Sequence, residues 1–415
     1  MIKILEKQKV ERDAFLSKEF IPREQQYLKD ELLRSKLIKI ITGPRRAGKS
    51  TFLFLLLKGI DFIYVNFDEV ELIKLIKNKD EFLDCLHSVY GNTKTIVFDE
   101  IQNLSEWDMF LNKLHRNDYN VFITGSNSNL LSGEFASSLT GRYRTVKLFP
   151  FSFQEHLKVL EAEKENPVFM LRKILVRGGF PDIVVRDEAS KVYFDDLISA
   201  VIFKDIAKRH RIQYPERIEM LINYLLSNVC HEINYAKTGI ACGIKNNRTL
   251  IKYLQFIENS YLFFFLDKFS YKPLVRLVSD KKIFCVDNGF ISSKNFSNSP
   301  DNGMYFENYV FTELIKKGLK PNSDLLYYKI KKDKEVDFVV KSIAGPEQLI
   351  QVCFDISNPK TEKREVAALS EASKELNCNK LLIITPDVDK TEIVDSKTIQ
   401  FVSIGKWALT NEKMN

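Results

Sequence analysis

The segment GPRRAGKS (43–50) limits this chain more than any other feature. It follows an apolar, β-branched run, LIKIIT (37–42), and continues into a second apolar run, STFLFLLLKG. Strand, glycine loop and helix in this order are the context that a phosphate-binding loop requires. The pattern predicts a strand buried on both faces, as in a parallel sheet, and a helix from Lys49 to about Leu57.

Phosphate binding explains the residue types in this loop. Gly43 and Gly48 permit backbone angles that a side chain would block, so loop N–H groups can point at phosphate oxygens at the helix N-terminus. Lys49 is expected to neutralise the β- and γ-phosphates of ATP, and Ser50 to place its hydroxyl on Mg²⁺. The expected nucleotide-binding residues are Gly43, Pro44, Arg45, Arg46, Ala47, Gly48, Lys49, Ser50 and Thr51.

A second segment supplies the carboxylates that such a site needs. In TIVFDEIQN (95–103), four apolar or β-branched residues end in Asp99 and Glu100. Asp99 is expected to hold Mg²⁺ through water, and Glu100 to act as general base on the attacking water.

A third strand, YNVFITGSNS (119–128), ends in polar residues. We expect Asn127, or failing that Ser126, to sense the γ-phosphate; a polar turn that caps a helix is the open alternative. Arg142 and Arg144 follow, and either could stabilise transition-state charge, from the same chain or across a subunit boundary. Arg142 is the first choice, and two surface arginines are the alternative.

The resemblance to a known family rests on six segments, which are IPREQQYLKDELLRSKLIKIITGPRRAGKST, YVNFDE, IVFDEIQN, FITGSNSNLL, LTGRYRTVKLFPFSFQE and RGGFPD. Together they resemble a prokaryotic (archaeal and bacterial) family of AAA-type P-loop ATPases that carry a winged helix and an uncharacterised, restriction-endonuclease-like C-terminal domain. The resemblance implies an α/β fold, namely a P-loop αβα sandwich (1–156), a helical lid (157–215), a winged helix (216–275) and an α/β nuclease-like domain (276–415).

The middle of the chain has two basic regions. Helix, short turn, helix and strand pair across 233–270 follow the winged-helix order, with Leu250, Leu254 and Ile257 expected in its core. The DNA-binding candidates on the opposite face are Lys245, Asn246, Arg248 and Lys252. A protein-packing role is the alternative. A second basic cluster holds Lys204, Lys208, Arg209 and Arg211, for which a solvated helix face and DNA contact are both open.

The last third reads as helix, three strands, helix and a closing strand, KLLIITPD. This order resembles a nuclease core, in which carboxylates bind Mg²⁺ and activate water. Glu307, Asp337 and Gln351 are the nuclease-like candidates. The position expected to hold lysine is Cys353, which carries no positive charge, so activity is doubtful. A lysine relocated to, for instance, Lys329 or Lys334 could restore it.

Composition adds the remaining expectations. The net charge of +7 permits nucleic-acid binding without requiring it. Six scattered cysteines, no signal-peptide core and no long apolar run predict a cytoplasmic protein with no membrane span. We expect an ATP- and Mg²⁺-dependent ATPase that acts on or with double-stranded DNA. A nucleotide-dependent switch that binds protein partners and a Mg²⁺-dependent nuclease are the alternatives. Assembly into a homo-oligomer is left open.

Overall fold

The computed structural model describes residues 1–128, 139, 141–159, 167–186, 190–294, 301–330 and 334–410. The chain divides into two units, of which unit 1 holds residues 1–149 and 259–261, and unit 2 holds residues 150–258 and 262–415. The finer division into lid, winged helix and C-terminal domain stays a prediction.

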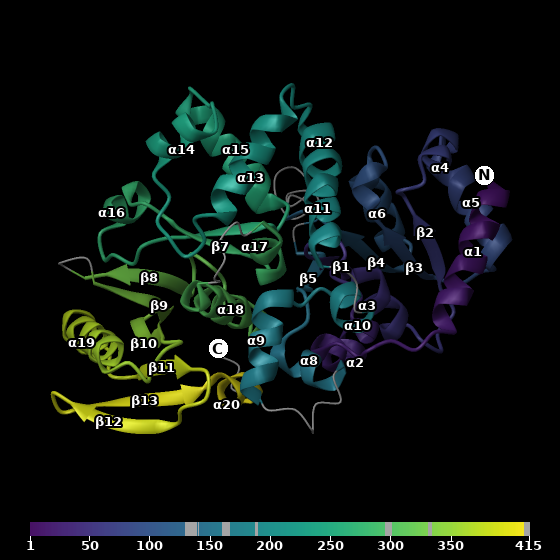
Figure 1. Ribbon diagram of the computed structural model, residues 1–415. Helices are drawn as coiled ribbons and strands as arrows, with labels where there is room; N and C mark the ends of the chain where they lie inside the picture. The colour runs from purple at the N-terminus through teal and green to yellow at the C-terminus, as the bar shows by residue number, and fades with distance from the viewer. Residues whose placement is uncertain are drawn as a thin grey trace. The chain divides into compact units, whose positions relative to one another are not determined.

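Five parallel strands form the sheet of unit 1, in the order β2-β3-β4-β1-β5 (Figure 1). Their residues alternate between two cores. Ile38 and Ile40 face one core with helices α1, α4, α5 and α6, whereas Ile41 faces a second core with α2 and α3. Both faces of the sheet are therefore buried, as the apolar runs predict. The strands are β1 (Ile38–Thr42), β2 (Ile63–Asn66), β3 (Thr95–Asp99), β4 (Asn120–Gly125) and β5 (Tyr143–Lys147).

Two helices of unit 1 precede the first strand, and the other described helices lie between consecutive strands. The helices are α1 (Ile2–Leu16), α2 (Lys29–Arg34), α3 (Lys49–Leu56), α4 (Val70–Leu75), α5 (Lys79–Tyr90) and α6 (Trp107–Arg116), with short 3₁₀ turns at η1 (Glu24–Leu28) and η2 (Ile101–Asn103). The expected α/β class, with a parallel sheet behind the glycine loop, is confirmed.

Unit 2 begins with helices and a strand pair. They are α8 (Phe153–Val159), α9 (Pro167–Arg177), α10 (Pro181–Arg186), α11 (Ser190–Ala200), the π-helix η4 (Val201–Ala207), α12 (Lys208–His210), α13 (Pro215–Leu226), α14 (Tyr235–Ala241), α15 (Asn247–Asn259), β6 (Phe263–Leu266), α16 (Pro273–Val278), β7 (Lys282–Cys285) and α17 (Asn288–Lys294). Strands β6 and β7 pair antiparallel. Leu250, Leu254 and Ile257 of α15 are buried, as expected.

The glycine pair in RGGFPD, which interrupts the helical pattern, has a specific partner. Asp287 accepts hydrogen bonds from the N–H groups of Gly179 (2.7 Å) and Gly289 (2.8 Å). Gly178 has φ +79°, and a Cβ there would lie 1.9 Å from Asp287 Oδ1. A side chain at residue 178 would therefore separate α9 from the start of α17.

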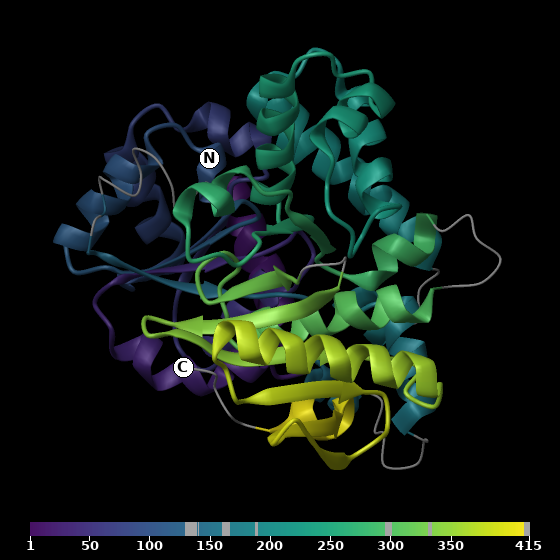
Figure 2. The ribbon, with the colours of Figure 1, turned by 90° about the vertical axis from the view of Figure 1, so that its left-hand side faces the viewer.

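A mixed six-stranded sheet ends the chain, in the order β12-β13-β11-β10-β9-β8. Helix α19 lies across one of its faces (Figure 2). Leu369, Ala372 and Leu376 of this helix share one buried core with Leu349 and Ile383 of the sheet. KLLIITPD was expected to close the sheet and does not, since β13 pairs parallel with β11 and β12 adds an antiparallel edge. The elements are α18 (Asn302–Lys316), β8 (Leu325–Lys329), β9 (Glu335–Ser342), β10 (Gly345–Val352), α19 (Pro359–Leu376), β11 (Leu381–Thr385), β12 (Lys390–Val394), β13 (Lys397–Ser403) and α20 (Ile404–Leu409).

Candidate functional site

The glycine loop lies between β1 and α3 at the carboxyl edge of the parallel sheet. Gly43 has φ +148°, and a Cβ at this position would lie 1.9 Å from the carbonyl oxygen of Leu148. Gly48, with φ +87°, is the N-cap of α3. Only glycine therefore fits where the loop leaves β1, and the loop is held close to the segment that follows β5.

Lys49 is folded back over its own loop. Its side chain is buried, and Nζ donates to the carbonyl oxygens of Gly43 (3.1 Å) and Pro44 (2.9 Å). An ammonium group held by neutral carbonyls can be drawn to a phosphate, since charge-assisted contacts are the stronger ones.

Ser50 and Asp99 form the candidate metal position. Ser50 Oγ donates to Asp99 Oδ2 (2.6 Å), and Asp99 also accepts from Tyr64 (3.1 Å) and from the Thr124 hydroxyl. Burial and the neighbouring Glu100 raise the pKa of Asp99 above its usual value. A divalent cation would relieve the same charge, so this donor set fits Mg²⁺.

Glu100 and Asn127 follow adjacent strands, β3 and β4, and so reach the same edge of the sheet. Glu100 has a left-handed backbone (φ +53°), and its carboxylate accepts from Gln102 and from Ser126 (3.3 Å). Asn127 is buried. Strand β4 also pairs with β1, with Thr42 opposite Gly125. The sheet thus brings the loop, the two carboxylates and Asn127 to one edge.

The other expected loop residues have distinct surroundings. Arg45 lies 3.8 Å from Asp68, Arg46 has φ +63°, Ala47 is buried and Thr51 is half-buried in the first turn of α3. Pro44 contributes its carbonyl to Lys49.

The two candidate arginines lie at the wrong edge for an action within the same chain. Tyr143 pairs with Ile38 and Arg144 with Lys39, at the amino end of the strand whose carboxyl end carries the loop. Four residues of strand span about 13 Å. Arg142 contacts Asn112 (3.2 Å), and Arg144 pairs with Glu31. This register disfavours a γ-phosphate contact from Arg142 within the same chain. The role of Arg142, for which action within the chain and across a subunit boundary were both open, stays a prediction.

Sequence reasoning missed several residues around the loop. Arg23 is buried and donates to the carbonyl oxygens of Ala47 (2.8 Å) and Phe149 (2.5 Å), so it links the loop to the segment that follows β5. Tyr64 and Thr124 hold Asp99. Arg23 lies in one of the segments that carry the family resemblance, but no local pattern distinguishes it from a surface arginine.

The DNA-binding candidates are all exposed. They are Lys245, Asn246, Arg248 and Lys252, at the start of α15 and on its outer face. Asn246 Oδ1 accepts from the N–H of Arg248 (2.8 Å) and so caps the helix, which leaves it less free to contact a base. In the second basic cluster, Lys204, Lys208 and Arg211 are exposed and Arg209 is half-buried.

The nuclease-like candidates are brought together around a residue that the sequence did not suggest. Lys282, on β7, is buried, and its Nζ lies 2.7 Å from Glu307, 2.9 Å from Glu335 and 3.5 Å from Asp337. Burial opposes the charge of Lys282, but Glu307 and Asp337 outweigh it and raise the pKa of its ammonium well above the usual value. Gln351 donates to a fourth carboxylate, Glu365 (2.5 Å), and accepts from the backbone N–H of Asp337 (3.4 Å).

Of the suggested lysine replacements, Lys334 lines the same pocket as the nuclease-like candidates Glu307, Asp337 and Gln351, whereas Lys329 does not line it. Lys329 pairs with Glu232 (2.8 Å) and Lys334 with Glu371 (3.0 Å). Cys353 is buried, and burial raises the pKa of its thiol to about 12, so it stays uncharged. Among the described residues, no group of three or more His, Cys, Asp or Glu side chains is arranged to hold a metal ion.

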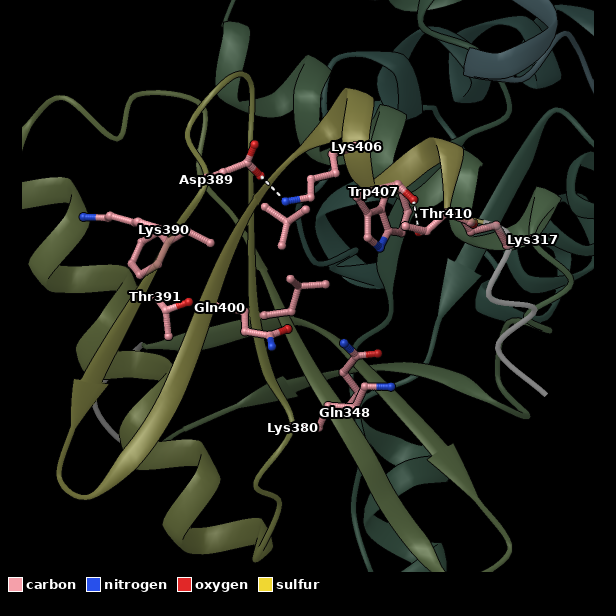
Figure 3. Close-up of a pocket in the computed structure, with 13 residues that line it drawn as sticks. Lys317, Gln348, Lys380, Asp389, Lys390, Thr391, Gln400, Lys406, Trp407 and Thr410 are labelled. Atoms are coloured by element: carbon pink, nitrogen blue, oxygen red, sulfur yellow. Dashed lines mark hydrogen bonds and ion pairs between the residues drawn. The ribbon is translucent and has the colours of Figure 1, made fainter.

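A separate pocket of about 500 Å³ lies beside the C-terminal sheet, where β12, β13 and α20 supply most of its lining (Figure 3). Lys380, Lys406 and Trp407 line it, and Lys406 faces Asp389 at 3.9 Å. None of the nuclease-like candidates belongs to it.

Among the described residues, no helix is both long and apolar enough to cross a bilayer.

Comparison with known families divides the chain into three parts. Residues 35–157 match the AAA domain model, residues 169–299 match a domain of unknown function (DUF8612), and residues 302–407 match another domain of unknown function (DUF4143). The first match covers the loop, both carboxylates and Asn127.

The chain is also similar to two relatives and to one solved structure. The chain is 35% identical to an uncharacterized protein of Methanocaldococcus jannaschii, MJ1544, over 90% of this chain and 88% of that protein. It is 29% identical to an uncharacterized protein of Haemophilus influenzae, over 95% and 100%. The Walker-type ATPase PABY2304 of Pyrococcus abyssi matches with a TM-score of 0.44 and 16% identity, over 66% and 96%.

Proposed function

Because this chain belongs to the same family as the uncharacterized protein MJ1544, and its residues 35–157 are an AAA domain, we propose that unit 1 binds ATP with Mg²⁺ and hydrolyses it. The observation that carries the proposal is the shared sheet edge, at which the glycine loop, Asp99, Glu100 and Asn127 meet.

Each residue has a role that its surroundings support. Loop N–H groups and Lys49 hold the phosphates, and Ser50 and Asp99 would hold Mg²⁺, which when bound neutralises phosphate charge. Glu100 takes the proton of the attacking water, and its bonds to Gln102 and Ser126 orient the carboxylate. Asn127 senses the γ-phosphate from the neighbouring strand.

Phosphate release from ATP tests this proposal. We expect turnover by the wild type that depends on Mg²⁺, and none above background by Lys49→Ala, because the lysine supplies charge to the phosphates. Lys58→Ala, at an exposed lysine after the same helix, is the matched control and should retain turnover. Equal release by all three proteins would refute the assignment.

We further propose that the ATPase acts on or with double-stranded DNA, through the exposed basic residues of α15. Adding duplex DNA to the ATPase assay should raise turnover, and DNA binding should weaken steeply with salt, as phosphate contacts do. No stimulation and no salt-sensitive binding would favour a nucleotide-dependent switch that binds protein partners instead.

A second candidate function, Mg²⁺-dependent phosphodiester cleavage by the C-terminal domain, is favoured by Lys282. This lysine brings to Glu307 and Asp337 the positive charge that Cys353 lacks. Incubation of plasmid DNA with the protein and Mg²⁺ tests it. Cleavage should be lost in Asp337→Asn and Lys282→Met, and intact plasmid with the wild type would exclude it.

A further inference from the structure

A three-residue segment from late in the chain lies beside the nucleotide loop. Residues 259–261 fold with unit 1, although the residues on both sides of them belong to unit 2. Asn259 is the last residue of α15, and β6 begins two residues after Tyr261. The segment is thus a direct covalent extension of the helix that carries the DNA-binding candidates.

Tyr261 reaches the base of the loop. Its hydroxyl lies 2.8 Å from Thr42 Oγ1, and both residues are buried. Thr42 is the last residue of β1 and immediately precedes Gly43. The ring of Tyr261 meets that of Phe149 edge-on, with centroids 6.4 Å apart. A shift of the loop at Gly43 therefore reaches Tyr261 through one hydrogen bond.

Asn259 reaches the other half of the site. Its Oδ1 accepts a hydrogen bond from Ser128 Oγ (2.8 Å), and Ser128 directly follows Asn127. The segment therefore contacts the chain beside both the phosphate loop and the γ-phosphate sensor.

The backbone of Tyr261 has an uncommon conformation that contacts of its side chain hold in place. Its φ of +62° lies in the left-handed region, which a bulky side chain rarely adopts. Such conformations persist where neighbouring contacts hold them, and they concentrate at switch regions. The hydrogen bond to Thr42 and the ring contact with Phe149 supply such contacts.

We propose that Asn259 and Tyr261 are positioning residues that couple the nucleotide state of the loop to α15. The inference rests on the proposed function, because it requires a nucleotide at the loop. It adds a route by which that nucleotide controls the surface with Arg248 and Lys252. Thr42 and Ser128 move with the bound phosphates, and the segment transfers that movement along the backbone into the helix.

Hydrogen exchange of α15 in the full chain, with and without ATP, tests the coupling. In the wild type we expect ATP to change exchange in residues 247–258. In Tyr261→Phe, which keeps the ring and loses only the hydroxyl, the response should be about fivefold smaller, as one net hydrogen bond allows. Tyr253→Phe is the matched control, since that tyrosine lies on α15 and its hydroxyl bonds no described residue.

Partner variants identify the route. Thr42→Val should reduce the response as Tyr261→Phe does, and combining the two should add nothing further. Ser128→Ala and Asn259→Ala form the second such pair. Additive effects of Thr42→Val and Tyr261→Phe would refute transmission through this hydrogen bond.

Binding of a fluorescent ATP analogue to the same samples separates the two proposals. If Tyr261→Phe binds the analogue and its α15 responds as in the wild type, the coupling is refuted and the ATPase proposal stands. If the wild type binds no analogue, the nucleotide assignment fails and the coupling fails with it.

Discussion

At the scale of single residues, Glu100 is the group whose chemistry one substitution can isolate. Its carboxylate accepts hydrogen bonds from Gln102 and Ser126 (3.3 Å), which orient it at the carboxyl edge of the sheet.

Glu100→Gln should separate ATP binding from hydrolysis. The amide keeps the size of the side chain and cannot accept a proton, so we expect binding within a few-fold of the wild type and turnover reduced about 10²- to 10⁴-fold. Glu106→Gln, at an exposed position just before α6, should leave both unchanged. Binding of a fluorescent analogue and phosphate release give the two readouts; normal turnover by Glu100→Gln would exclude Glu100 as the base.

Asp287 predicts a dependence of stability on pH. Burial raises the pKa of its carboxyl from 3.8 to about 6. The folded protein therefore binds the proton more tightly than the unfolded chain. The stability that this carboxyl contributes is present below pH 3.8 and is lost as pH rises through about 6, an amount on the order of 3 kcal/mol.

Urea unfolding of the wild type and Asp287→Asn between pH 4 and 7 tests this shift. The wild type should lose stability relative to the variant as pH rises, since asparagine does not titrate. A constant difference across this range would mean that Asp287 titrates alike in the folded and unfolded chain.

The candidate site also shows which residues a local pattern can predict. Short segments specify the glycine loop, Asp99 and Glu100. Arg23 and Lys282 could not be found this way, because each contacts residues far away in the sequence. The edge that Arg142 occupies could not be predicted either, since it follows from the register of β5.

At the scale of secondary-structure elements, the apolar runs predicted the strands β1, β3, β4 and β11 and the helix α3, because each run is bounded by a turn or a polar end. The prediction for the C-terminal sheet lacked the strands β12 and β13. Strand β12 has no buried residues and β13 buries only Ile399 and Phe401, so neither shows the continuous apolar pattern of β11. Strands of this kind are recognised through the strand with which they pair, and this pairing is not a local property of the sequence.

Asn246 offers a test of an element's boundary. Its cap at the start of α15 predicts that Asn246→Ala lowers the free energy of unfolding by about 1 kcal/mol, whereas Asn246→Ser, which retains a capping oxygen, changes it little. Denaturant unfolding measures both variants. If Asn246 instead reads DNA bases, Asn246→Ser will lose sequence preference while stability stays unchanged, so a DNA-binding assay on the same proteins separates the roles.

At the scale of the whole molecule, the two tryptophans report on different units. Trp107 lies on α6 in unit 1, and Trp407 lies on α20 in unit 2. ATP binding stabilises only the fold that binds it, by about 2.7 kcal/mol at a concentration 100 times the dissociation constant.

Thermal unfolding of Trp407→Phe and Trp107→Phe, each followed by the remaining tryptophan, should show a larger ATP-induced shift for the transition seen by Trp107. Lys49→Ala should abolish that shift in both backgrounds. A shift of the Trp407 signal alone would place the nucleotide in unit 2.

The discontinuity of unit 1 has a consequence for the order in which the protein is made. A ribosome adds about 5–20 residues per second, so residues 150–258 take roughly 5–20 seconds to synthesise. During that interval Thr42 and Ser128 lack their hydrogen-bond partners, Tyr261 and Asn259. Both partners are present only once Tyr261 has emerged. A newly made chain therefore completes its nucleotide unit only after α15 has been translated, so a ribosome that stalls before residue 259 leaves that unit unfinished.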